Sequence, residues 1–217
     1  IYDPSMTEVY SMLGAVIFVS HDGGDTWEES SNGFPIQTPT ALNAFVVHPT
    51  NPDIAYAMTS AYESKTAIGI YKTENGGSEW TAVNAGLDIN TWDLQMDPLN
   101  PETLYAATNT GVYKTVDGAQ SWEHTSTGLP VGAVKDLALD LQNPLRLYAA
   151  TSRKVYRTKD GGGNWYAVNL GLPLKDSRFS DDRILEVDST GRVLYAAIRT
   201  SSSRGRGDTQ IYRAIMQ

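Results

Sequence analysis

The 217-residue sequence contains no cysteine, only three histidines and no long uncharged apolar run. Without cysteine, disulfide frameworks, zinc–thiolate sites and thiol nucleophiles are excluded. The histidines, His21, His48 and His124, are too scattered for a local metal-binding motif, so no metal and no cofactor are expected. A membrane span needs about 18 consecutive apolar residues without charge, and no window supplies them.

Basic residues are also few. The chain has 17 lysines and arginines against 25 aspartates and glutamates, which gives a formal net charge of −8. Proteins that bind nucleic acid through its phosphates collect Lys and Arg, so no nucleic-acid partner is expected. Apolar residues make up 41% of the composition, enough to build a core and too many for a disordered chain.

One motif recurs four times along the chain. It begins with Ser or Thr, places Asp or Asn two positions later, continues with Gly and ends on Trp, in residues 20–27, 73–80, 115–122 and 158–165. The four tryptophans are 53, 42 and 43 residues apart. A period of about 40 to 50 residues is typical of repeat architectures.

Short strand-like runs accompany each copy of the motif. Runs rich in Val, Ile, Tyr, Thr and Ala lie at 55–59, 104–108, 147–151 and 194–198, and a second set lies at 42–47, 92–96, 134–139 and 184–187. With a strand on either side of each motif, one repeat holds four strands in about 43 residues, which predicts an all-β fold, a β-propeller of about five four-stranded blades. The repeats are expected in one domain at 1–47, 48–96, 97–139, 140–187 and 188–217.

The motif resembles the Asp-box, or BNR repeat, and the resemblance covers most of the chain. Asp-box propellers include sialidases, xyloglucanase-type glycoside hydrolases, sortilin-type receptors and a photosystem II assembly factor. The resemblance implies a propeller but leaves the function open, because one fold hosts unrelated activities.

The motif itself has a structural interpretation. Asp or Asn followed by Gly supplies the positive φ values of a tight hairpin turn, and the side chain accepts hydrogen bonds from turn amides. Each Trp is expected to fold between neighbouring blades and to bury roughly 150–250 Å². Structural roles are therefore assigned to Asp22, Trp27, Asn75, Trp80, Asp117, Trp122, Asp160 and Trp165. In the resembling enzymes these turns lie on the face away from the active site.

Function is therefore expected on the opposite face, around the central channel. The blade-to-blade connections and loops such as Asn109-Thr110 belong to that face. Alignment of the innermost strands places Asn43, Trp92, Lys135 and Arg183 at one position and Ala44, Asp93, Asp136 and Ile184 at the next. The candidate binding site is a ring at the channel mouth, made of Trp92, Asp93, Lys135, Asp136 and Arg183. A solvated rim of ion pairs is the structural alternative.

Two kinds of enzyme can be weighed on the residues. Sialidases hold the substrate carboxylate with an arginine cluster, whose first member is expected before the first motif, and here no Arg precedes Arg146. A xyloglucanase-type hydrolase needs two carboxylates across a cleft, and Asp93 and Asp136 are the candidates. Those enzymes resemble two propellers around a cleft, whereas this chain holds one at most.

The sequence thus favours a secreted, cell-surface or periplasmic binding or scaffolding propeller. Its expected partner is a glycan or a protein, with Trp92 as a stacking platform. A glycoside hydrolase and a structural part of an extracellular assembly are the alternatives.

The charges divide unevenly along the chain, and the fifth repeat ends after its third strand. Residues 1–110 carry a net charge of −12 and residues 111–217 a net charge of +4. The expected ring is therefore dipolar, and an open blade edge favours self-association. The start at Ile1 fits a processed form or an excerpt of a larger propeller.

Overall fold

The computed structural model describes residues 9–13, 16–34, 40–61, 69–88, 90–152, 154–168, 177–178, 185–200 and 209–215. All regular structure in these ranges is β-strand, as predicted. No helix in the described ranges is long and apolar enough to cross a membrane.

The strands form five antiparallel sheets, which we number blade one to blade five in chain order. Blade one contains β1 (Val9–Leu13), β2 (Val16–Ser20) and β3 (Glu28–Glu29). Blade two contains β4 (Thr40–Val47), β5 (Ala55–Ala61), β6 (Gly69–Thr73) and β7 (Thr81–Ala82). Blade three contains β8 (Thr91–Met96), β9 (Leu104–Thr108), β10 (Gly111–Thr115) and β11 (Glu123–His124). Blade four contains β12 (Val134–Leu139), β13 (Leu147–Thr151), β14 (Val155–Thr158) and β15 (Tyr166–Val168).

Blade five is built around one long strand. β18 (Val193–Thr200) pairs on one edge with β17 (Leu185–Val187) and with β16 (Ser177–Arg178), and on the other edge with β19 (Thr209–Ile215). Within the described residues, nothing pairs with the free edge of β19. Blade five therefore lacks the short fourth strand of blades two to four there.

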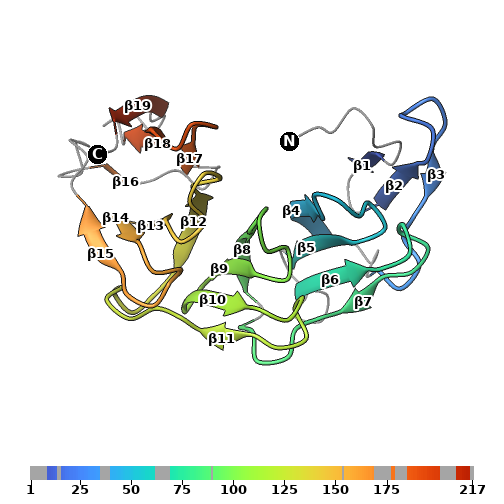
Figure 1. Ribbon diagram of the computed structural model, residues 1–217, viewed down its shortest axis with the longest axis horizontal. Coiled ribbons are helices and arrows are strands. Elements are labelled where there is room, and N and C mark those ends of the chain that lie inside the picture. Colours follow the sequence, from blue (N-terminus) through green and yellow to red (C-terminus); the bar gives the residue numbers. More distant parts are fainter. Residues whose placement is uncertain are drawn as a thin grey trace.

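The blades stand side by side in an arc (Figure 1). The strands nearest the centre are β4, β8, β12 and β17, and each contacts the next along the arc. The short strands β7, β11 and β15 lie at the outer rim (Figure 1). Blades one and five are the two ends of the open arc, so one face of each has no neighbouring blade in the described structure.

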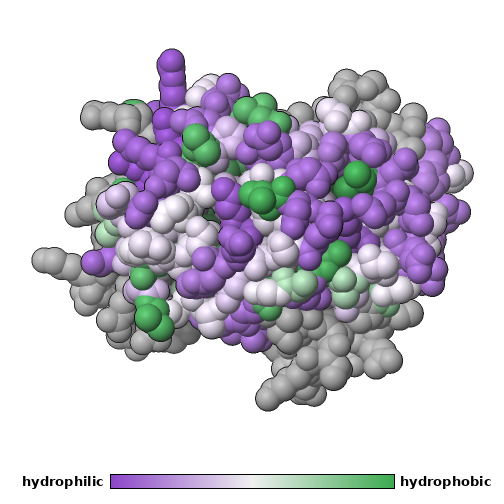
Figure 2. Space-filling view, turned by 60° about the horizontal axis from the view of Figure 1, so that its bottom comes forward, coloured by the Kyte–Doolittle hydropathy of each residue, from purple (hydrophilic) through white to green (hydrophobic). Residues whose placement is uncertain are grey.

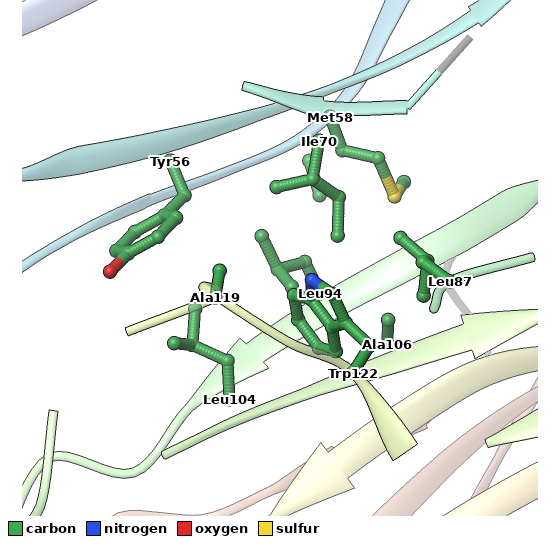
Figure 3. Packing of buried hydrophobic residues seen from close by; sticks show 10 residues of the cluster. Tyr56, Met58, Ile70, Leu87, Leu94, Leu104, Ala106, Ala119 and Trp122 are labelled. Atoms are coloured by element: carbon green, nitrogen blue, oxygen red, sulfur yellow. The ribbon is translucent and has the colours of Figure 1, made fainter. Parts of the chain in front are cut away.

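The core lies between blades rather than within any one of them. Between blades two and three, Tyr56, Met58 and Ile70 face Leu94 and the indole of Trp122 (Figure 3). Equivalent clusters join blades one and two, three and four, and four and five. Because each blade buries its apolar face against its neighbour, blades stabilise one another in pairs, as in other repeat proteins.

The recurring motif forms the turn before the last, short strand of blades one to four. In blade three the Thr115 hydroxyl donates to Asp117 Oδ1 over 2.6 Å and accepts the amide of Ala119 over 3.1 Å. The amide and hydroxyl of Ser121 donate to the same carboxylate over 3.0 and 2.6 Å. The turns around Asp22, Asn75 and Asp160 repeat this network. The carboxylates or amides at these positions therefore hold the turns together.

Three of the four motif tryptophans lie between blades. The indole N–H groups of Trp80, Trp122 and Trp165 donate to Ser30, Val83 and Thr125 carbonyls of the preceding blade over 2.8, 2.9 and 2.8 Å. The expectation that every motif Trp is wedged between blades fails at Trp27, whose indole N–H donates to Gly24 in its own turn. Blade one has no described blade before it, so no blade among the described residues covers Trp27, which is 43% exposed.

Glycines allow the backbones of adjacent blades to meet. Gly86 has a φ of +82°, and a Cβ there would lie 2.5 Å from the carbonyl oxygen of Trp122. The Trp122 amide donates to the neighbouring Ala85 carbonyl over 2.9 Å. Any side chain at Gly86 would therefore push blade three away from blade two.

The turn carboxylates make stability depend on pH. Hydrogen bonds from the Ser121 and Thr115 hydroxyls lower the pKa of Asp117 from 3.8 to about 2, and those from Thr158 and Asn164 do the same for Asp160. A folded-state pKa below the unfolded one gives stabilisation that is complete above the unfolded value and disappears as the pH falls toward the folded one. These turns should therefore lose stability between about pH 4 and pH 2.

The variant Asp117→Asn tests this dependence. Asn75 occupies the same position in blade two and accepts the same Ser/Thr-type hydroxyl bond, so the variant should fold. We expect its urea midpoint to fall less than that of the parent between about pH 6 and pH 3. Asp25→Asn, an exposed acid in another turn, is the control and should keep the parental pH dependence. An unchanged pH dependence in Asp117→Asn would contradict this account.

Candidate binding site at the channel mouth

Three innermost strands carry a β-bulge at the same position. The register shifts between Leu42 and Ala44 in β4, between Thr91 and Asp93 in β8, and between Val134 and Asp136 in β12. The extra residues are Asn43, Trp92 and Lys135, three of the four residues that the sequence alignment placed at one position. A bulge re-aims side chains relative to regular alternation. We call the face of the molecule on which these innermost strands begin the channel-mouth face.

Trp92 and Lys135 are in direct contact across blades three and four. The Lys135 Nζ lies 3.1 Å from the centroid of the indole ring, a cation–π contact. The indole Nε1 donates to Asn109 Oδ1 over 2.8 Å. Asn109 is in the turn between β9 and β10, and its backbone N–H donates to the backbone carbonyl of Asn90. These contacts fix the orientation of Trp92 while leaving it only partly buried.

Asp93 and Asp136 point into the protein rather than to the channel mouth. Each is only 3% exposed. Asp93 Oδ2 accepts the amide of Leu137 in the next blade over 3.1 Å and the Gln95 side-chain amide over 3.0 Å. Asp136 Oδ2 accepts the amide of Leu185 in blade five over 2.6 Å. Both carboxylates therefore link one innermost strand to the next.

The structure says less about the two other residues at this aligned position, Arg183 and Asn43. Arg183 lies outside the described residues. Asn43 is exposed at the bulge of β4. The structure thus brings Trp92 and Lys135 together, turns the two aspartates inward and adds Asn109 as the indole partner. The sequence predicts Asn109 on this face, but its contact with Trp92 joins residues 17 positions apart, and no local pattern encodes it.

Metal binding has little support in the described residues, and the apolar residues on the face seen in Figure 2 are scattered. Among the described residues, no group of three or more His, Asp or Glu side chains is arranged to hold a metal ion. Figure 2 views one face of the molecule, on which hydrophobic residues lie as separate spots among hydrophilic ones. Single exposed apolar side chains, such as Leu99, Val116 and Leu145, are ordinary on protein surfaces.

Comparison with known proteins gives structural matches alone. No family model and no curated protein matches the sequence. The GH74 xyloglucanase from Xanthomonas campestris superimposes with a TM-score of 0.73 and 16% identity, over 96% of this chain and 34% of the enzyme. YCF48 from Cyanidioschyzon merolae gives a TM-score of 0.61 and 12% identity, over 99% of this chain and 71% of that chain. A YCF48 bound to D1 peptide gives 0.60 and 16%, over 96% and 64%.

The chain has a β-propeller fold. The arc of one three-stranded and four four-stranded sheets and these superpositions agree on it, and the sequence prediction of an all-β propeller is confirmed. The propeller spans about a third of the length of the GH74 enzymes that it matches. Identities of 12–21% establish the fold and leave the activity to be argued from the site.

Proposed function

We propose that this propeller is a non-catalytic recognition module that binds a protein segment at its channel-mouth face. Trp92, Lys135 and Asn109 form the contact surface, and the turn motifs act as Asp-boxes that hold the blades. The observation that carries the proposal is the engagement of both candidate catalytic carboxylates by backbone amides of the next blade. A general acid or base needs a carboxyl group within reach of the substrate.

A protein ligand fits Trp92 better than a stacked sugar does. Lys135 already covers one face of the indole, and the indole N–H is bonded to Asn109. A sugar platform needs an open aromatic face, whereas partly buried, pre-oriented Trp residues are frequent anchors in protein interfaces. The neighbour bound to a D1 peptide supports a peptide ligand. A further structural match, an extracellular domain from B. thetaiotaomicron (TM-score 0.55, 13% identity), supports a location outside the cytoplasm.

The test is a binding screen with displayed peptide libraries and, in parallel, a glycan array. We expect peptide capture by the parent chain and at least a tenfold loss for Trp92→Ala, about 1.4 kcal/mol. Tyr166→Ala removes an exposed aromatic ring at the outer rim and should bind like the parent. Peptide binding that survives Trp92→Ala contradicts the proposal. If the parent chain binds glycans and no peptide, the ligand is a glycan and the proposed protein ligand is wrong.

Polysaccharide hydrolysis is the second candidate, favoured by the TM-scores of 0.71 and 0.73 against GH74 enzymes. It assigns Asp93 and Asp136 as the acid and base. A reducing-sugar assay on xyloglucan separates the two functions: we expect no turnover from the parent chain. Turnover that Asp93→Asn abolishes, in a variant that keeps the parental urea midpoint, would establish the enzyme instead.

A further inference from the structure

Adjacent blades share a repeating pair of contacts. A buried tyrosine on the second strand of one blade donates its hydroxyl to a glycine carbonyl in the motif turn of the next blade. Tyr56 bonds to Gly118 and Tyr105 to Gly161, both over 3.2 Å. The Trp of the same motif turn also packs against the blade that carries the tyrosine. This two-way contact defines what each blade face requires from its neighbour.

At blade four the tyrosine half of this contact is unmet. Tyr148 is 1% exposed and packs against blade five, yet within the described residues its hydroxyl has no hydrogen-bond partner. Burial raises the pKa of Tyr148, and the nearby Arg157 guanidinium opposes that rise without meeting hydrogen-bond geometry. The matching glycine carbonyl would belong to a motif turn following β19. A buried hydroxyl without a partner costs free energy, so this position calls for an acceptor.

In the part of the chain that the structure describes, no blade covers the far face of blade five, which carries apolar side chains around Arg213. Register pairs Tyr195 with Arg213, Ala197 with Ile211 and Val193 with Ile215, so these side chains share one face of the sheet. Tyr195 is 40% exposed although it corresponds to the buried Tyr148, and Ile211 and Ile215 are 76% and 70% exposed. The first blade mirrors this, because Trp27 is 43% exposed.

We propose that the two end faces of the arc bind further blades of this same repeat. A fourth strand on the free edge of β19 would carry a motif turn whose glycine carbonyl accepts the Tyr148 hydroxyl. The next blade would then cover Tyr195, Ile211 and Ile215, and the last would pack against the exposed Trp27 indole. The proposal rests on the repeated inter-blade contacts and is independent of the ligand proposed above.

The number of blades follows from size. Five sheets of this chain correspond to 71% of the YCF48 chain, so a propeller of that length holds about seven, two more than described here. A second copy of this chain is the rival occupant, since its acidic first half would be drawn to the basic second half. A second copy would bring five blades to a gap that fits about two, so a second copy is the less favoured occupant.

The test extends the chain with its own repeats. Residues 116–158 followed by residues 116–168 are fused after Ala214, which supplies the fourth strand of blade five and two complete blades. We expect the extended chain to unfold at a higher urea concentration than the parent. Tyr148→Phe should lower the midpoint of the extended chain while leaving the parental midpoint unchanged or higher. An extended chain that unfolds at or below the parental midpoint contradicts the proposal.

Two measurements on the unextended chain decide the matter independently. Tyr105→Phe should lower its urea midpoint and Tyr148→Phe should not, because only Tyr105 has an acceptor. Equal losses in both variants would overturn the inference. In sedimentation the parent should be monomeric, with Trp27 open to a soluble quencher. A dimer that shields Trp27 and dissociates at high salt would assign the end faces to a second copy.

Discussion

Replacement of Trp80 by alanine is expected to lower the free energy of unfolding by about 3–5 kcal/mol, the cost of truncating a large buried aromatic side chain. Trp80 is 1% exposed, contacts Phe34 and Phe45 with ring centroids 5.9 Å apart, and bonds to the Ser30 carbonyl. The change removes packing and leaves that carbonyl without its partner. Equilibrium urea unfolding followed by circular dichroism measures the loss.

Trp27→Ala is the matched control for this prediction. It deletes the same residue from the same motif, but its indole is 43% exposed and bonds within its own turn. We expect a loss below about 1 kcal/mol, because surface substitutions away from a packed contact cost little. Equal losses at Trp27 and Trp80 would mean that the motif Trp stabilises its turn rather than the contact between blades.

Asp136→Ala is expected to destabilise the protein by about 1–3 kcal/mol, the cost of a buried amide left without its acceptor. The carboxylate is 3% exposed and accepts the Leu185 amide over 2.6 Å across the boundary between blades four and five. Asp136→Asn keeps an acceptor oxygen and should lose less. Urea unfolding of both variants measures the difference.

Glu186→Ala provides the control for the Asp136 variants. Glu186 is an exposed acid on β17, next to the amide that Asp136 binds, so its removal tests the loss of one negative charge at this boundary. We expect a change within about 0.5 kcal/mol. A stable Asp136→Ala variant would show that the carboxylate is dispensable for the blade contact and would return it to the list of catalytic candidates.

The blades themselves were predictable because each repeat carries its own local signals. Asp-Gly or Asn-Gly turns and a Trp at a fixed offset mark blades one to four, and strand-like runs rich in apolar residues also mark blade five. A further signal was present in the sequence: a glycine follows each motif Trp by six residues, as at Gly33, Gly86 and Gly128. Gly33 and Gly128, like Gly86, approach the backbone of the next motif Trp.

The direction of the site side chains was not predictable to the same extent. Strict alternation along β8 and β12 leaves the bulges at Trp92 and Lys135 out of account, because neither bulge contains the glycine that often marks one. Asp93 and Asp136 were therefore expected at the channel mouth, and they lie inside. The exposure of Trp27 was also not predictable from the sequence, because a repeat pattern does not show which blade lacks a neighbour.

The wedging of the motif tryptophans between blades is the central structural claim, and fluorine NMR of protein labelled with 5-fluorotryptophan tests it most directly. The five signals can be assigned with single Trp→Phe variants and then titrated with a soluble gadolinium chelate. We expect the signals of Trp80, Trp122 and Trp165 to resist broadening and that of Trp27 to broaden first. Equal broadening of all four motif tryptophans would contradict the arrangement of the blades.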